Sequence, residues 1–341
     1  MKPVRLVVAD RSPTVRAVLK RLLAQSSTLE IVDEAGDGVQ LAESVRRHAP
    51  DVILTEFLPP DEDGSTAFDE TMQQCRAPVV VLTSRPDAKG SQLPYWGFSG
   101  RVVEVLQKPQ VPEAWNDLAL TLLTLLQQVG MPTHAAAGDD PPAAIPGSRG
   151  ELAYVAIGGS TGGPGAVVRL LREFGTTFRV GVAVVQHIAD GFEHSFADWL
   201  RQELGANVRV AKAGDALEPG TIRVAPVGSH LLIDRAGTLR LDRKTPPRRG
   251  HRPSADILFR SFLSVGAHRV AAVLLSGMGD DGVDGMRTLR DAGSLTLAQD
   301  ESSSAVYGMP RLALESGAAE MALTPTEIGR MLSRLMTGES G

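Results

Sequence analysis

Short apolar runs alternate with stretches of helical spacing along the first third of the chain. The first run, Val4–Ala9, ends at a polar Asp10, and apolar residues then recur at helical spacing between residues 15 and 23. Further runs and helical patterns predict strands at residues 31–35, 51–56, 79–83 and 102–106, and helices at residues 41–48 and 111–129. Strands that alternate with helices predict a parallel sheet with helices on both faces.

The same alternation resumes in the second half. Apolar runs predict strands at residues 152–157, 180–186, 208–211, 221–225, 231–234, 238–241, 270–275 and 294–298. Helical patterns occupy residues 165–174, 192–204, 254–265, 284–292 and the tail from residue 325. The short strands between residues 208 and 241 flank Pro-Gly and Ala-Gly turns, so we expect some of them to be antiparallel. This half is therefore predicted to be a doubly wound, mainly parallel α/β domain.

A change in composition separates the two halves. Residues 131–150 are rich in Ala, Pro, Gly and Asp, which is typical of a flexible linker. We therefore expect a first domain at residues 1–128, a linker at residues 129–150 and a second domain at residues 151–341. A chain of 341 residues is long enough to bury two cores of this size.

Charge and cysteine content argue against several classes of protein. The 35 Lys and Arg residues against 40 Asp and Glu give a formal net charge of -5, and neither half is strongly basic, so we expect no nucleic-acid partner. Cys75 is the only cysteine, which excludes an intrachain disulfide and a thiolate metal cage. No apolar run approaches the ~20 residues that span a bilayer, and the start is too short in apolar residues for a signal peptide. We expect a cytoplasmic protein without membrane insertion.

One local segment, residues 235–252, is strongly basic. Its charged residues include Arg240, Arg243, Lys244, Arg248 and Arg249. We interpret it first as a solvated loop, and second as a docking patch for an acidic partner.

The stretch Tyr154-Val-Ala-Ile-Gly-Gly-Ser-Thr-Gly-Gly163 carries the most specific chemistry. Glycines on both sides of Ser160 permit a strained turn from strand to helix, which is typical of a nucleophile elbow. The register does not fit a phosphate-binding loop, because it lacks both Gly-x-Gly-x-x-Gly and a Gly-Lys-Ser/Thr ending. A tight structural turn with an incidental serine stays open as the alternative.

Three predicted strands of this half end in polar groups. Ser160 follows one apolar run, His187 follows the next, and Asp280 and Asp281 lie in a glycine-rich loop after residues 270–275. The carboxyl ends of parallel strands share one edge of a sheet, so we expect these groups to meet. A serine needs an imidazole to take its proton and a carboxylate to orient that imidazole, and amides of the loop at residues 277–279 are candidate oxyanion donors.

Other assignments at these positions remain open. The pattern does not choose between the two aspartates, and either of them is also a candidate helix cap. Four other histidines compete for the role of base, although none directly follows an apolar strand: His194, His230, His251 and His268.

Several motifs together resemble the C-terminal domain of chemotaxis protein-glutamate methylesterases. The resemblance covers residues 150–335, with Gly159 in place of the usual Ala, and rests on Ile157-Gly-Gly-Ser-Thr-Gly-Gly163, Gln186-His187, Arg252-Pro-Ser-Ala-Asp256, Gly277-Met-Gly-Asp-Asp-Gly282, Ala298-Gln-Asp-Glu301 and Val306-Tyr-Gly-Met-Pro310. It implies hydrolysis of γ-glutamyl methyl esters on chemoreceptors with release of methanol, and in some members deamidation of glutamines. It implies no metal or organic cofactor.

The resemblance also implies a role for each candidate residue. Ser160 is expected to be the nucleophile, His187 the general base and then acid, and Asp281 the residue that orients the histidine. Thr161 and the backbone of Met278 are expected to support the oxyanion. A serine hydrolase of the methylesterase type is thus the predicted function, and a non-catalytic docking protein of a chemosensory pathway is the alternative.

The first half resembles a response-regulator receiver in outline, which implies a flavodoxin-like (βα)5 fold. Receivers hold Mg²⁺ with two acidic residues after the first strand and accept a phosphoryl group on an aspartate after the third. Here Asp10 is followed by Arg11, and Glu56 occupies the acceptor position. Thr83 and Lys108 match the hydroxyl and the lysine of the family.

These departures predict a degenerate receiver. Asp10 alone is a poor Mg²⁺ site, and we expect Arg11 to repel the ion and to pair with Glu56. Glu56 is expected either to mimic a phosphorylated residue or to have no regulatory effect. Residues 91–101, with Tyr95 and Trp96, also depart from the receiver pattern.

The resemblance further implies the partners. They are methyl-accepting chemoreceptor-type proteins and a chemosensory histidine kinase. In the family the receiver covers the active-site face until activated, so regulation through an interdomain interface is expected.

Overall fold

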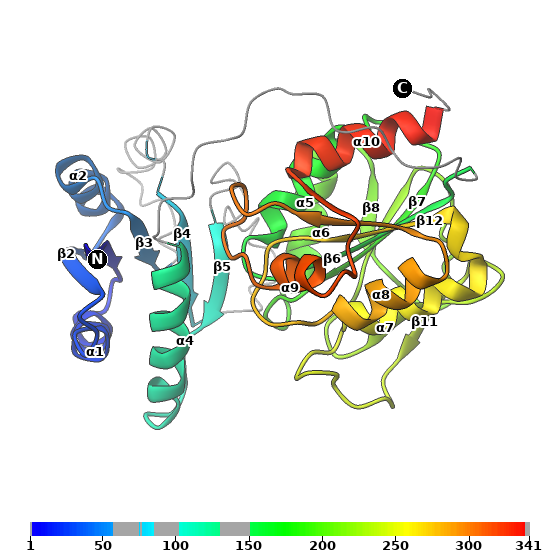
Figure 1. Ribbon diagram of the computed structural model, residues 1–341. Helices are drawn as coiled ribbons and strands as arrows, with labels where there is room; N and C mark the ends of the chain where they lie inside the picture. Colours follow the sequence, from blue (N-terminus) through cyan, green and yellow to red (C-terminus); the bar gives the residue numbers. More distant parts are fainter. Residues whose placement is uncertain (1, 57–74, 76, 85–101, 130–150, 338–341) are drawn as a thin grey trace. The chain divides into compact units, whose positions relative to one another are not determined.

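The structure is a computed structural model that describes residues 2–56, 75, 77–84, 102–129 and 151–337 (Figure 1). The chain divides into two compact units, Met1–Pro132 and Thr133–Gly341, and each is described by itself. The predicted linker, apart from residue 129, and the predicted departure at residues 91–101 lie outside the described residues.

The first unit contains a five-stranded parallel sheet in the order β2-β1-β3-β4-β5. Its strands are β1 (Val4–Ala9), β2 (Leu29–Ala35), β3 (Val52–Thr55), β4 (Val79–Thr83) and β5 (Val102–Gln107). Its described helices are α1 (Pro13–Leu23), α2 (Gly38–His48) and α4 (Ala114–Val129). This strand order is that of the flavodoxin-like fold, which confirms the predicted fold class of this half.

Local sequence explains where the first helix begins. Ser12 caps α1 by accepting a hydrogen bond from the amide of Val15 at 3.4 Å, and Pro13 occupies its first turn, where no amide donor is needed. Its apolar face buries Leu19, Leu22 and Leu23. Asp10 lies between β1 and this helix, directly after the carboxyl end of the strand.

The second unit contains a seven-stranded sheet in the order β14-β13-β12-β6-β7-β9-β8, in which every pair of neighbours is parallel. Its strands are β6 (Tyr154–Gly159), β7 (Gly181–Gln186), β8 (Asn207–Val210), β9 (Thr221–Val224), β12 (Val270–Leu274), β13 (Leu295–Gln299) and β14 (Met321–Leu323). A separate antiparallel hairpin joins β10 (His230–Ile233) to β11 (Leu239–Asp242). The mainly parallel fold and the partly antiparallel segment are both confirmed.

Helices cover both faces of this sheet (Figure 1). The helices are α5 (Gly163–Arg172), α6 (Glu193–Leu204), α7 (Ala255–Ser261), α8 (Val283–Asp291), α9 (Met309–Glu315) and α10 (Pro325–Thr337). Helix α10 packs on α5, and α7 packs on α8 at the opposite face. Because both faces are covered, every residue of β7 and of β12 is buried.

The structure corrects the predicted helix at residues 254–265. Only residues 255–261 are α-helical, and a 3-10 turn follows over Phe262–Val265, a common way for a helix to end. A second 3-10 turn, Ala267–Arg269, leads into β12. The sequence patterns did not predict α9 or β14, because seven and three residues are too short for a periodic signal.

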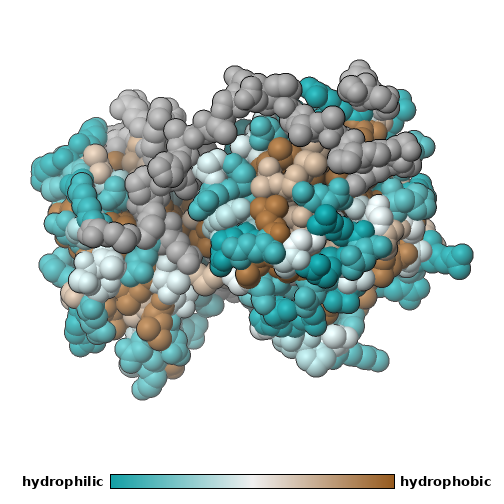
Figure 2. Space-filling view, in the orientation of Figure 1, coloured by the Kyte–Doolittle hydropathy of each residue, from teal (hydrophilic) through white to brown (hydrophobic). Residues whose placement is uncertain are grey.

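Polar residues cover most of the face of the second unit seen in Figure 2, with smaller apolar patches between them. Among the described residues only a few large apolar side chains are exposed, and single ones are normal on protein surfaces. One of them, Met278, lies in the loop that follows β12, beside the candidate site. No described helix has both the length and the apolar character needed to cross a membrane.

Candidate active site

Ser160 lies in a turn that only glycine permits. Strand β6 ends at Gly159, and α5 starts after Gly162, whose φ of +77° lies in the left-handed region. A Cβ atom on Gly162 would stand 2.5 Å from that of Ala305 and 2.7 Å from Oγ of Ser276. The amide of Ser160 donates to the carbonyl of Ser276 at 3.0 Å, which fixes the turn against the loop after β12.

The ends of β6 and β7 place Ser160 next to His187. Gly159 and Gln186 are register partners, and the amide of His187 donates to the carbonyl of Gly159 at 2.9 Å. The side-chain nitrogen of Gln186 donates to the carbonyl of Ser160 at 2.7 Å. The two residues therefore leave neighbouring strands at the same edge of the sheet.

Asp281 reaches this place from the other side of β6. It follows β12, which pairs with β6, and its Oδ2 lies 2.9 Å from Nε2 of His187. Burial opposes ionisation of this carboxyl, but hydrogen bonds from His187, from Ser254 Oγ (2.6 Å) and from the amide of Ala255 (2.7 Å) hold its pKa below the usual value. Sequence analysis included Ser254 and Ala255 only as part of a family motif and assigned neither residue a role at Asp281.

The two nitrogens of the His187 ring are in different situations. Nε2 contacts Asp281, whereas Nδ1 is buried and has no hydrogen-bond partner within the described residues. Asp280, which the strand pattern alone did not separate from Asp281, forms an ion pair with Arg249 and is partly exposed. The structure therefore brings Asp281, and not Asp280, to the imidazole.

The competing histidines occupy other positions. His230 is buried, and its Nε2 lies 3.1 Å from the carbonyl of Pro246. His194 lies in α6, and His268 lies in the 3-10 turn before β12, at the opposite edge of the sheet. His251 stacks on His187, with ring centroids 3.7 Å apart and an angle of 2° between the planes.

The predicted oxyanion donors are only partly available. The amide of Gly277 donates to the carbonyl of Val306 at 3.0 Å, so the structure excludes this member of the loop at residues 277–279. The amide of Met278 makes no backbone hydrogen bond within the described residues. Thr161 is buried, and its carbonyl accepts from Oγ of Ser276 at 2.7 Å. Hydrogen bonds thus anchor both segments near Ser160.

The candidate residues of the first unit also converge, at the ends of β1, β3, β4 and β5. Nζ of Lys108 lies 2.5 Å from Oδ2 of Asp10 and 2.6 Å from Oε1 of Glu56. The amide of Lys108 donates to the carbonyl of Thr83 at 2.7 Å. The ion-pair partner that the structure shows for Glu56 is thus Lys108, and the pairing of Arg11 with Glu56 stays a prediction.

This donor set does not fit Mg²⁺. The ion requires several oxygen ligands in octahedral geometry, whereas Asp10 and Glu56 here share one ammonium group. Within the described part of the chain, no group of three or more His, Cys, Asp or Glu side chains is placed to hold a metal ion.

Fold and site together define a class: a response regulator that joins a receiver-type unit to a parallel α/β unit with serine, histidine and aspartate at one edge. A family model described as "CheB methylesterase" matches residues 155–332, and one described as "Response regulator receiver domain" matches residues 6–114. The chain belongs to the CheB methylesterase family. The resemblance inferred from the motifs is thereby confirmed.

Individual proteins agree with this assignment. A protein-glutamate methylesterase/protein-glutamine glutaminase of Anaeromyxobacter dehalogenans is 38% identical over 98% of this chain and 97% of its own length. One from Myxococcus xanthus is 35% identical over 94% of this chain and 90% of its own. The crystal structure of the Thermotoga maritima CheB methylesterase catalytic domain is 30% identical, with a TM-score of 0.52, and covers 54% of this chain and 98% of that domain.

Proposed function

We propose that this protein hydrolyses the methyl esters of glutamate side chains in chemoreceptor-type proteins. The observation that carries the proposal is the 2.9 Å contact of His187 with Asp281 beside the turn that holds Ser160. The names of the similar curated proteins support the substrate class.

The first half-reaction follows from the two ring nitrogens. Asp281 accepts a hydrogen bond from the N–H at Nε2, which fixes the tautomer in which Nδ1 carries a free lone pair. Nδ1 of His187 takes the proton of Ser160 as Oγ attacks the ester carbonyl. The amides of Met278 and Thr161 stabilise the oxyanion. His187 then gives the proton to the departing methoxide, so that methanol leaves and an acyl-serine remains.

Water completes the reaction. His187 removes a proton from a water molecule as its oxygen attacks the acyl-serine, and then returns that proton to Oγ of Ser160. The products are the glutamate carboxylate and the free serine. Attack on the amide of a glutamine would release ammonia by the same steps, in agreement with the second name of the related proteins.

Labelling with a fluorophosphonate probe tests this proposal directly. The wild-type chain should be labelled and should release methanol from a methylated glutamyl peptide, and Ser160→Ala should do neither. Ser316→Ala, an exposed serine after α9, is the matched control and should behave as wild type. A wild-type chain that is not labelled would favour the non-catalytic docking protein.

We also infer that the receiver unit acts through binding rather than through phosphorylation that depends on Mg²⁺. Its acidic residues share Lys108, and its acceptor position holds Glu56. A chemosensory histidine kinase is still the partner that a receiver domain suggests, and the cytoplasm is the compartment in which both partners meet the enzyme. The contact with the kinase would then be a docking contact.

A further inference from the structure

We propose that His251 is a positioning residue for the catalytic imidazole, because its ring covers one face of His187. The two rings are parallel within 2°, and their centroids are 3.7 Å apart. That separation is van der Waals contact, so no water fits between the rings. This inference rests on the proposed function for the role of His187.

The imidazole needs such a support. Among the described residues its side chain has one hydrogen bond, from Nε2 to Asp281, and none at Nδ1. A single hydrogen bond leaves the ring free to turn about that contact. A second ring against its face restricts this rotation and so limits the positions that the buried Nδ1 can take.

The backbone of residues 248–251 holds His251 at this position. The amide of Arg248 donates to the carbonyl of His251 at 3.0 Å, and the amide of His251 donates to the carbonyl of Arg248 at 2.9 Å. The two residues between them, Arg249 (φ +51°) and Gly250 (φ +84°), have left-handed backbone angles, as in a tight hairpin turn. This conformation is unfavourable for an arginine unless its side chain is held.

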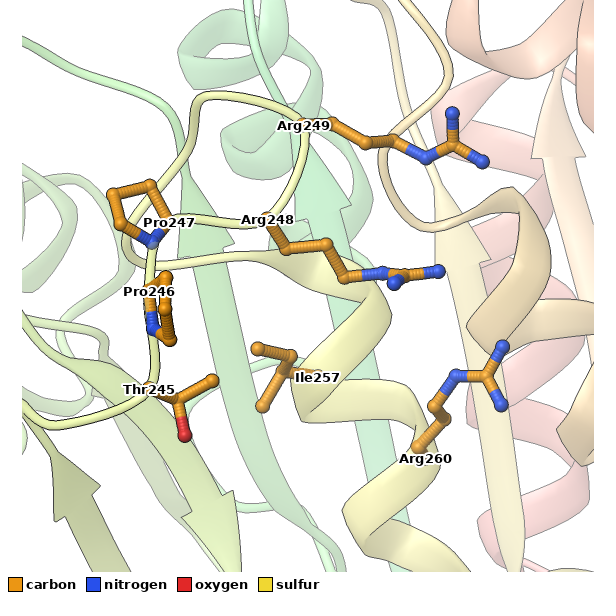
Figure 3. Close-up of a pocket in the computed structure, with 7 residues that line it drawn as sticks. All are labelled: Thr245, Pro246, Pro247, Arg248, Arg249, Ile257 and Arg260. Carbon is orange, nitrogen blue, oxygen red and sulfur yellow. The ribbon is translucent and has the colours of Figure 1, made fainter.

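Carboxylates of α7, of α8 and of the loop after β12 form ion pairs with Arg248 and Arg249. Nε of Arg248 lies 2.7 Å from Asp256, which is fully buried, and its Nη2 lies 2.9 Å from Asp284. Arg249 contacts Asp284 at 2.8 Å and also pairs with Asp280. Figure 3 shows the side chains of Arg248 and Arg249 extending from the loop in the same direction. The basic segment is thus tied to α7 and α8 at these two residues.

The charge of His251 also suits the role. Burial, and next the neighbouring His187, lower its pKa from the ordinary value. The charged groups that face it are His187 after β7 and Asp280 and Asp281 after β12, with Arg248 and Arg249 on its own loop. A neutral ring of this kind does not compete with the positive charge that His187 carries during turnover.

Three substitutions of His251 in the full-length chain test whether His187 needs an aromatic ring against its face or only a side chain of similar size. With p-nitrophenyl acetate as substrate, His251→Ala and His251→Leu should lower kcat about 10-fold, with KM within about twofold of wild type. His251→Phe should stay within about twofold in both constants. His268→Ala, an exposed histidine at the opposite edge of the sheet, is the control.

A spectroscopic readout makes the test independent of turnover. In a chain labelled with ¹⁵N-histidine, the proton between Nε2 of His187 and Asp281 should give a sharp downfield resonance in wild type and in His251→Phe. It should broaden in His251→Ala and in His251→Leu. Equal kcat values for His251→Ala and wild type, or for His251→Leu and His251→Phe, would overturn the role of His251. A wild-type chain that shows the sharp resonance but is neither labelled nor active would instead refute the proposed function.

Discussion

Each unit gathers charged side chains beyond the carboxyl ends of its own parallel strands. The contacts within the two clusters differ. In the second unit, Asp281 engages one nitrogen of His187 and leaves the other without a partner among the described residues. In the first unit, the ammonium group of Lys108 contacts the carboxylates of both Asp10 and Glu56. One cluster keeps a proton acceptor available, whereas in the other a single ammonium group bridges two carboxylates.

This difference shows what an edge of a parallel sheet needs in order to react. The topology only gathers the groups, as it does for ligand sites in many α/β proteins. Reactivity then requires that most groups be held and one be left available. Ser254, Ala255 and His251 contact the members of the second cluster, whereas in the described part of the first unit Lys108 contacts both carboxylates.

The largest expected effect is on the reactive cluster. Asp281→Asn should lower kcat about 10⁴-fold, because the amide favours the wrong tautomer of His187. The pKa of Asp281 lies below its usual value, so the carboxylate should stay ionised at pH 5 and above, and its protonation should add no loss of wild-type rate in that range. Ester hydrolysis measured at several pH values checks both statements.

Two other aspartates provide the comparison. Asp280→Asn should cost far less than Asp281→Asn, because Asp280 pairs with Arg249 and does not contact the imidazole. Asp291→Asn, exposed at the end of α8, should match wild type. Equal losses for Asp280→Asn and Asp281→Asn would contradict the assignment of the orienting carboxylate.

A smaller effect, on stability rather than on rate, is expected in the first unit. Lys108→Met removes the cation shared by two carboxylates, of which Asp10 is 1% exposed. Loss of one partner of a buried ion pair costs about 3–5 kcal/mol, so amides of β1 and β5 should exchange faster with solvent. Hydrogen exchange followed by mass spectrometry measures this.

The exposed pair of Lys20 with Glu34 is the matched control. Lys20→Met should cost less than about 1 kcal/mol, because the lysine is 63% exposed and water screens the pair. Adding Asp10→Asn to Lys108→Met should restore part of the protection. Unchanged exchange in Lys108→Met would mean that the shared lysine does not stabilise this unit.

The sequence predicted which residues gather at one edge of the sheet more reliably than it predicted their side-chain contacts there. Alternating strands and helices were enough to place Ser160, His187 and the two aspartates together. They did not separate Asp280 from Asp281, because both follow the same strand. The contact of Asp281 with His187 and the pairing of Asp280 with Arg249 distinguish them. Such partners lie far apart in the chain, and periodicity carries no signal for them.

The receiver shows the same limit. The motif positions identified Asp10, Glu56 and Lys108 as neighbours, but they did not predict that Lys108 contacts both carboxylates, and the pairing of Glu56 with Arg11 stays a prediction. The lysine reaches both carboxylates because β5 ends beside β4 and directs residue 108 over the edge of the sheet. The sequence showed that Arg11 replaces the family's second acidic ligand, and the structure shows that Lys108 lies between Asp10 and Glu56.

The last prediction is that a phosphoryl donor has no effect on the wild-type chain. Incubation with acetyl phosphate and Mg²⁺ should leave the wild-type chain without hydroxylamine-sensitive phosphate and its ester hydrolysis unchanged, because Arg11 stands where a second acidic ligand is needed, and Asp10 and Glu56 are left to share Lys108. Intact-mass spectrometry and the esterase assay measure the two outcomes. In Arg11→Asp/Glu56→Asp, the second acidic ligand and the shorter acceptor are restored, and phosphate should appear. Phosphate on the wild-type chain would show that Lys108 yields to the metal, and the contrast between the two clusters would then be one of degree, with both able to react.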